Sequence, residues 1–399
     1  MPHAPSTAPI RRTSIARLGL LWLAGMDMRL TLLAVPPVLP IIHQELQLEE
    51  KGVAALSGLP VLLFGLMAIP GALLIARIGA RRALLAGIVL IGVSSALRGV
   101  GSSSVVLFAM TFCMGIGIAI SQPTFSALVG QWFPHSVARA TGCWSNGLLV
   151  GELLSASLTL PLVLPLVGSW EVTFAFWSAP VLLSAVLLAV GTPHLASEAL
   201  TWRRGGLPNW REGRLWQLGV LQSSASLIYF GANTFIPDYL HATNQAGLVG
   251  PALAALNGGQ VPASAVIALV PLRVLARRST SIAVGVAIVV ALAAVIGLPG
   301  TPTVVAAGVF GFCAAYILVL SFALPALLVG AADVPRLSAG MFAISYTLAF
   351  LVTLVAGALW DATHLAASAF LPVLASTAVV TLLGPRLCGL AQSAVVRAV

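Results

Sequence analysis

The chain has 399 residues, of which 59% are hydrophobic and only 8% are charged, and its mean hydropathy is +1.03. A soluble domain carries about 25% charged residues, so this composition excludes a soluble globule, and the high hydrophobicity excludes a disordered chain. The net charge of +9 does not call for a nucleic-acid partner, because membrane proteins collect basic residues in their cytoplasmic loops. Composition therefore predicts a polytopic integral membrane protein in a lipid bilayer.

Twelve apolar stretches are long enough to cross a bilayer as helices of about 20 residues. They are continuous apolar runs, which favours helices over a β-barrel. In chain order, the expected spans lie near 18–42, 52–76, 82–101, 104–130, 140–166, 172–192, 214–240, 249–276, 280–299, 302–330, 337–360 and 365–386. We expect the first to be an uncleaved helix rather than a signal peptide, because its apolar run is long and contains Arg29.

The positions of the basic residues predict an orientation. With a cytoplasmic N-terminus, only Arg29, Lys51 and Arg98 would lie away from the cytoplasmic side, and the other 17 of the 20 basic residues would lie on it. This asymmetry predicts that both termini are cytoplasmic. We expect a multi-pass protein in the inner membrane of a bacterial cell.

The two halves of the chain repeat each other at an offset of about 197 residues. The matching pairs are Arg77–Arg82 with Arg273–Arg278, Pro40 with Pro237, and Arg139 with Arg336. The repeat predicts an all-α membrane fold of 12 transmembrane helices in two six-helix bundles, at 1–192 and 214–399. A cytoplasmic central loop over 193–213 would join them, and the substrate site would lie between them.

The turn after the second span resembles a family signature. Arg77–Arg82 is similar to the G-x-x-x-D-R-x-G-R-R loop of the major facilitator superfamily, with Ala76 in place of the Asp. The drug/proton antiporters of that superfamily have an Arg in span four where this chain has Thr111, and a Pro in span five that this chain lacks. The resemblance therefore implies the superfamily fold without the antiporter hallmarks.

A narrower resemblance is to the cyanate/nitroimidazole permease family. It rests on segments of spans one, two, three, seven and eleven: Met28–Pro40, Leu59–Gly65, Leu90–Arg98, Gln222–Leu240 and Leu337–Tyr346. This resemblance implies a permease for cyanate, a nitroimidazole or a similar small solute.

Arg29 is expected near the middle of the bilayer. It follows Arg17 by about 12 residues, so at about 1.5 Å per residue it lies about 18 Å along the first span. A guanidinium at that depth costs at least about 2.5–3.5 kcal/mol, so Arg29 must face a polar cavity or a partner. We expect it to bind an anionic or strongly polar substrate group, and the alternative is a structural ion pair with Glu152 or Asp27.

Three other charged residues inside the expected spans are candidates besides Arg29. Glu152 in span five is also near the midplane, and it could carry a proton, act as counter-ion to Arg29, or be a structural carboxyl. Asp27 points about 200° away from Arg29 around the helix, so we expect it to meet another helix, with a gating or secondary role. Arg98 is close to the outer end of span three, where it would either snorkel to the surface or gate and guide anions.

The second half offers neutral polar candidates. Gln222, Tyr229 and Asn233 are spaced by seven and four residues, so they share one face of span seven. We expect this face to line a cavity, and helix–helix hydrogen bonding is the alternative. Asn257 and Gln260 in span eight and Tyr346 in span eleven complete the candidate substrate-binding set.

No catalytic constellation or metal-ligand cluster stands out, so we expect neither an enzyme nor a cofactor. The four cysteines are scattered within apolar stretches, which indicates neither a disulfide framework nor a zinc site. The internal repeat favours a monomeric carrier over an oligomeric channel. The sequence predicts a secondary active transporter of a small anion or small polar solute, working by alternating access, with proton coupling left open. A multidrug/proton efflux antiporter is the alternative of the same class, and a membrane-embedded enzyme is the alternative of another class.

Overall fold

The computed structural model describes residues 12–48, 50–191, 207–275, 277–330 and 332–397, and this part of the chain contains helices and no strand. The helices of the first half are α1 (Arg12–Leu30), α2 (Val35–Glu45), α3 (Glu50–Leu66), α4 (Ala68–Ile78), α5 (Ala80–Leu97), α6 (Ser104–Trp132), α7 (Val137–Leu158), α8 (Leu164–Val167) and α9 (Trp170–Gly191). Those of the second half are α10 (Gly213–Ala242), α11 (Val249–Gly258), α12 (Gln260–Leu269), α13 (Leu272–Leu275), α14 (Arg278–Gly297), α15 (Thr301–Leu328), α16 (Val334–Thr363) and α17 (Leu371–Arg397).

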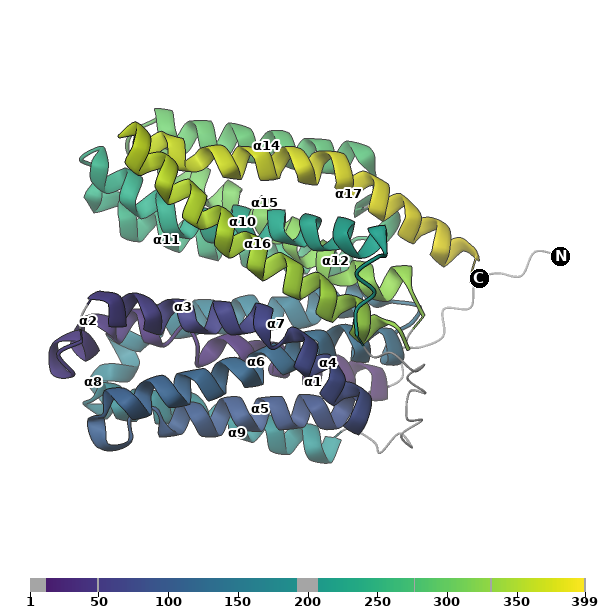
Figure 1. Cartoon of the computed structure of the whole chain (residues 1–399), viewed down its shortest axis with the longest axis horizontal. Coiled ribbons are helices and arrows are strands. Elements are labelled where there is room, and N and C mark those ends of the chain that lie inside the picture. The colour runs from purple at the N-terminus through teal and green to yellow at the C-terminus, as the bar shows by residue number, and fades with distance from the viewer. Residues whose placement is uncertain (1–11, 49, 192–206, 276, 331, 398–399) are drawn as a thin grey trace.

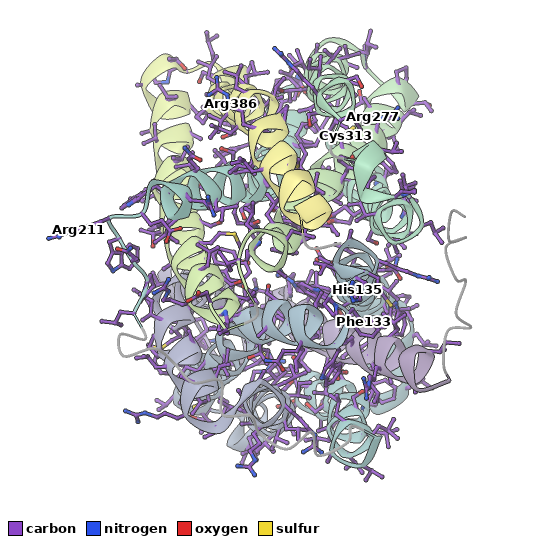
Figure 2. All side chains as sticks on the ribbon, turned by 90° about the vertical axis from the view of Figure 1, so that its right-hand side faces the viewer. Phe133, His135, Arg211, Arg277, Cys313 and Arg386 are labelled. Atoms are coloured by element: carbon purple, nitrogen blue, oxygen red, sulfur yellow. The ribbon has the colours of Figure 1, made fainter. Side chains whose placement is uncertain are left out.

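The helices form two bundles that lie side by side. Helices α1 to α9 make up the lower bundle in Figure 1, and α10 to α17 make up the upper one. Helix α1 begins and α17 ends at the same side of the molecule, which we call the terminal end, and α2 lies at the opposite, distal end (Figure 1). In the view onto the terminal end, the guanidinium of Arg211 projects from the molecule (Figure 2).

Most of the helices are able to span a membrane. Within the described ranges, ten helical stretches are long and apolar enough to do so, and there are 11 when the bent pair α3–α4 counts as one. Helix α10 has 30 residues and is not among them. Its polar side chains, including Gln222 and Asn233, lower its hydropathy. The all-helical, multi-span fold is thus confirmed, and the count of 12 spans stays a prediction.

Three of the spans are broken near the middle of the molecule. The first breaks between α1 and α2, just before Pro36 and Pro37 in the first turn of α2, because proline has no N–H to donate. The pair α3–α4 bends by 54°. The break between α11 and α12 falls at Gly258 and Gly259. At the first of these breaks Thr31, Leu32 and Ala34 are buried, so the interrupted helical hydrogen bonding there lies inside the protein.

Helices α1 and α7 are packed backbone to backbone. A Cβ at Gly151 of α7 would collide with the carbonyl oxygen of Met26 of α1, so only a glycine permits this approach. Because Arg29 and Glu152 lie on these two helices, a single tightly packed helix pair carries both charged residues.

The two bundles contact each other in the half of the molecule nearer the terminal end. Trp144 of α7 stacks on Phe322 of α15, with ring centroids 5.3 Å apart. Asn146, also on α7, donates a hydrogen bond to Ser264 Oγ of α12 at 3.0 Å. Aromatic and polar side chains therefore close this half of the interface.

Candidate functional site

A cavity of about 640 Å³ lies between the two bundles. Its polar side chains from the first bundle are Arg29, Thr111, Glu152 and Ser157, and those from the second are Tyr229, Asn233, Thr234 and Asn257. On α1, α2, α7 and α10, the residues that line the cavity are Arg29, Glu152, Tyr229 and residues that come after them in the sequence. On these helices the chain runs from the terminal end toward the distal end. The cavity therefore occupies the distal half of the interface, above the closed contacts of the terminal half.

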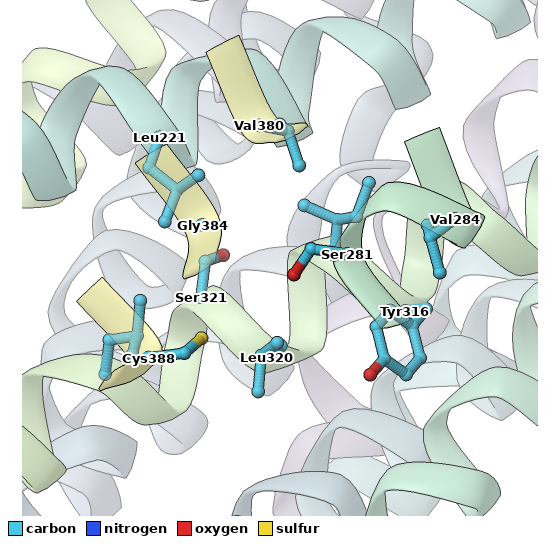
Figure 3. Close-up of a pocket in the computed structure, with 11 residues that line it drawn as sticks. Leu221, Ser281, Val284, Tyr316, Leu320, Ser321, Val380, Gly384 and Cys388 are labelled. Carbon is cyan, nitrogen blue, oxygen red and sulfur yellow. The ribbon is translucent and has the colours of Figure 1, made fainter. Parts of the chain in front are cut away.

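A second pocket lies inside the bundle formed by α10 to α17. Figure 3 shows its lining, which includes Leu221, Val284, Tyr316 and Cys388. Its volume is about 20 Å³, which is room for about one water molecule. It is too small for an organic solute, so the cavity between the bundles is the candidate site.

Arg29 lies at the floor of the cavity, and its side chain is only 6% exposed. Its guanidinium carbon is 5.7 Å from the centre of the Phe64 ring of α3, a cation–π arrangement. Its buried Nε has no hydrogen-bond partner, and Arg29 and Glu152 do not approach within the 4.0 Å of an ion pair in the described structure. Since no ion pair holds it in the described structure, the guanidinium remains available to a ligand.

Glu152 and Tyr229 join the two bundles at the same level. The Tyr229 hydroxyl of α10 donates a hydrogen bond to Oε1 of Glu152 of α7. The second carboxylate oxygen, Oε2, is buried and makes no hydrogen bond. Arg29 lines the same cavity, so the three side chains form one polar cluster at its floor.

Three amides form a chain of hydrogen bonds on the opposite wall. Gln260 Nε2 donates to Asn257 Oδ1 at 2.8 Å, and Asn257 Nδ2 donates to Asn233 Oδ1 at 3.0 Å. Asn233 Nδ2 in turn donates to the backbone carbonyl of Tyr229 at 3.0 Å. Asn233 and Asn257 line the cavity, and Gln260 holds them from behind.

Three of the candidate substrate-binding residues, Gln222, Gln260 and Tyr346, do not line the cavity. Gln222 is fully buried in the second bundle, where its Oε1 accepts a hydrogen bond from Ser321 of α15. Gln222 therefore makes a helix–helix hydrogen bond, which was the alternative to lining a cavity. Tyr346 of α16 lies beneath the cavity, where its hydroxyl accepts a hydrogen bond from Gln122 Nε2 of α6 at 3.0 Å. Its ring meets Phe64 edge-on at 5.4 Å, so Tyr346 supports the layer on which Arg29 rests.

Asp27 lies on the side of α1 that faces away from the cavity, as the helical angle predicts. Its side chain is fully buried and interacts with the side chain of Ser184 of α9. Neither of its carboxylate oxygens makes a hydrogen bond of ordinary geometry. Asp27 therefore makes no direct contact with the cavity, and its position is one turn away from the break that follows α1.

Arg98 is fully buried, so of its two alternatives the snorkelling one is wrong. Its Nη2 donates to the carbonyl oxygen of Thr31 at 2.7 Å and lies 2.8 Å from Ser95 Oγ. Its guanidinium stacks over the ring of Phe174 of α9 at 4.1 Å. Thr31 stands at the break between α1 and α2, so Arg98 satisfies a carbonyl that the break leaves outside the helix, rather than facing an entrance.

Sequence reasoning missed several residues of this region. Thr111 lines the cavity with a buried hydroxyl that lacks a partner, and Phe64 lies under Arg29. Gln122 and Asn146 connect the bundles below the cavity. These two amides are polar side chains within apolar spans, which is the signal that could have found them, whereas nothing in the local sequence distinguishes Phe64 from lipid-facing phenylalanines.

Two bundles of membrane-spanning helices around a central polar cavity define a membrane carrier rather than an enzyme. A sequence model of the Major Facilitator Superfamily matches residues 20–357, and the chain belongs to this family.

Two relatives support the same conclusion. The chain is 28% identical over 242 residues to the cyanate transport protein CynX of Escherichia coli K12, which covers 60% of this chain and 62% of that protein. It is 28% identical over 226 residues to the 2-nitroimidazole transporter of the same organism, covering 56% of each. The match thus spans about three fifths of these relatives.

Solved structures share the fold over nearly the whole chain. The fucose:proton symporter FucP of E. coli aligns with a TM-score of 0.73 at 16% identity, covering 94% of this chain and 99% of that one. The proton:xylose symporter XylE aligns with a TM-score of 0.73 at 13% identity, covering 92% and 94% of the two chains. The family and the relatives are transporters, which excludes the membrane-embedded enzyme.

Proposed function

We propose that this protein is a secondary active transporter that moves a small anion or small polar solute through the cavity between its two bundles. The single observation that carries the proposal is Arg29, a buried guanidinium at the cavity floor with no ion pair and an unpartnered Nε. A buried polar group without a hydrogen-bond partner costs free energy. A ligand whose oxygen or nitrogen atoms accept hydrogen bonds from Arg29 removes this cost, and this favours its binding. The relatives that transport cyanate and 2-nitroimidazole support solutes of this kind.

Glu152 makes proton coupling part of the proposal. An anion and the Glu152 carboxylate would compete for the single guanidinium of Arg29, because no other cationic side chain lines the described cavity. A proton on Glu152 removes this competition, so the anion and the proton would bind together and be carried together. The unpartnered Oε2 is the atom on which that proton would be held.

The closed terminal half supports alternating access around this site. Trp144 and Asn146 hold the bundles together below the cavity, while the cavity itself occupies the distal half. In our proposal, the terminal end faces the cytoplasm, residues 1–192 and 214–399 move as two rigid halves, and this conformation receives solute from outside. Rocking of the halves about the level of Glu152 and Tyr229 would then open the cytoplasmic side.

The test is solute uptake into proteoliposomes containing the purified full-length chain, with labelled cyanate and 2-nitroimidazole as probes. Arg29→Gln is expected to lower uptake at least about tenfold, since a charge-assisted contact is lost. Arg386→Gln, an exposed arginine of α17, is the matched control and should keep wild-type uptake. Uptake by Arg29→Gln at the wild-type rate would show that Arg29 does not bind the solute.

Proton coupling has its own test. Glu152→Gln should still exchange labelled for unlabelled solute across the membrane. It should no longer move protons, measured with a pH-sensitive dye inside the vesicles. A solute-driven pH change that survives Glu152→Gln would remove the proton role from Glu152.

A further inference from the structure

We propose that the solute is a ring-sized organic anion that touches two separate polar levels of the cavity, rather than a bare inorganic anion of a few atoms. This inference rests on the proposed function, because it assigns the anionic group to Arg29. It adds a second contact, a hydrogen-bonding edge on the solute that Asn233 recognises. A heteroaromatic carboxylate has both features.

The two levels are one helical turn apart. The lower level contains Arg29 and the Glu152–Tyr229 hydrogen bond at the floor of the cavity. The upper level contains Asn233, which follows Tyr229 by four residues on α10, and its partner Asn257. Four residues of an α-helix rise about 6 Å, so a solute that touches both levels must be about as long as an aromatic ring with a carboxylate. A triatomic anion held at Arg29 would not reach Asn233.

The upper level is built to present one fixed amide. Asn257 Nδ2 uses both of its hydrogens, one to Asn233 Oδ1 and one to the carbonyl of Leu253. Asn233 Nδ2 uses one hydrogen on the carbonyl of Tyr229, so its second hydrogen stays available. Since Asn233 is only half-buried and lines the cavity, it offers the solute a donor in a fixed orientation.

The other walls of the cavity are largely apolar. Leu33 and Val61 contribute from the first bundle, and Phe230 and Leu253 contribute from the second. Apolar walls with a small number of convergent polar groups are typical of sites for organic ligands. The cavity volume of about 640 Å³ also falls within the range of about 300–1,000 Å³ that such sites have. The same walls would give a small inorganic anion nothing to bind.

The experiment measures binding to the purified full-length protein in detergent by titration calorimetry, with nicotinate, benzoate and cyanate as probes. Nicotinate and benzoate have the same size and charge, and only nicotinate carries a ring nitrogen that can accept a hydrogen bond. We expect nicotinate to bind about 5–10-fold more tightly than benzoate, the effect of one hydrogen bond. We expect cyanate to bind at least about tenfold more weakly than nicotinate.

Two variants test the upper level. Asn233→Leu should weaken nicotinate about 5–10-fold and leave benzoate within about twofold, and Asn257→Leu, which releases Asn233, should act in the same direction. Thr353→Val is the control, because that hydroxyl bonds only to the Ala349 carbonyl of its own helix. Thermal unfolding of each variant shows that it is folded.

The outcomes separate this inference from the proposed function. The two-level site is overturned when cyanate binds as tightly as nicotinate, when no ring acid binds, or when folded Asn233→Leu weakens all three probes equally. If cyanate binds as tightly as nicotinate, or if Asn233→Leu weakens all three probes equally, loss of binding in Arg29→Gln would still support Arg29 as the anion contact. Binding of all probes unchanged in Arg29→Gln would instead overturn the proposed function.

Discussion

Tyr229 of α10 donates its hydroxyl hydrogen to Glu152 of α7, and this hydrogen bond connects the two bundles at the floor of the cavity. It lies at the boundary between the closed terminal half and the distal half that holds the cavity. Any relative movement of the bundles about this level must keep, lengthen or break it. The bond therefore links the occupancy and charge of the site to the arrangement of the bundles.

Tyr229→Phe removes this hydrogen bond and keeps the ring. We expect unfolding to be easier by about 1–3 kcal/mol, because Glu152 is left buried without a partner, and uptake to fall about tenfold. Tyr316→Phe is the matched control, since the Tyr316 hydroxyl bonds to the Leu275 carbonyl within the second bundle. Its uptake should stay within about twofold of wild type. Equal uptake in both variants would mean that the inter-bundle bond does not matter for transport.

Arg98→Met leaves the Thr31 carbonyl at the α1–α2 break without its hydrogen bond. A buried acceptor without a partner is costly, so we expect a loss of about 2–4 kcal/mol, read as a lower midpoint of thermal unfolding in detergent. Arg82→Met removes an exposed arginine at the other end of α5 and should change the midpoint little. If both variants melt like wild type, Arg98 does not support the break.

Asp27→Asn replaces a fully buried carboxyl that has no hydrogen bond of ordinary geometry. An isolated charge in such a place is expensive, whereas the amide has nearly the same shape and no charge. We expect the midpoint of thermal unfolding to stay the same or rise by a few degrees. Asp333→Asn breaks the 3.4 Å ion pair with Arg336 near the surface and should cost less than about 1 kcal/mol. A large loss of stability in Asp27→Asn alone would show that the charge of Asp27 is needed.

Gly142→Val acts on the closed half of the interface. A Cβ at Gly142 of α7 would lie 2.6 Å from the backbone nitrogen of Ala268 of α12, so valine must push the bundles apart there. We expect the terminal half to open, measured as faster thiol labelling of a Ser264→Cys probe in a chain freed of its native cysteines. Ser264 is fully buried in the closed state.

Gly357→Val of α16 is the control for this wedge, because a Cβ at that position meets nothing within 4 Å. Labelling of the Ser264→Cys probe should then stay at the slow rate. Equally slow labelling in Gly142→Val would mean that the contact between α7 and α12 does not close the interface.

The sequence alone determined the class of this protein. Hydropathy excluded a soluble chain, and the lengths of the apolar runs predicted membrane helices, ten or 11 of which the described structure contains, because the thickness of the bilayer sets the length of a membrane helix. The similar positions of Arg29 and Glu152 along their helices could be predicted too, since each residue of a helix rises by about 1.5 Å, and both residues line the cavity. The direction of Asp27 away from the cavity followed from the angle of about 100° between successive residues.

Only the tertiary structure decided which of these side chains meet. Gln222 and Tyr229 share one face of α10, yet Gln222 bonds to Ser321 within its own bundle and Tyr229 reaches Glu152 in the other. The place of Arg98 in the chain left a snorkelling and a gating position open, and the side chain is buried in the first bundle instead. Depth and direction along one helix are local properties, whereas contacts between helices depend on how the bundles pack. The sequence pattern of a single span does not indicate this packing.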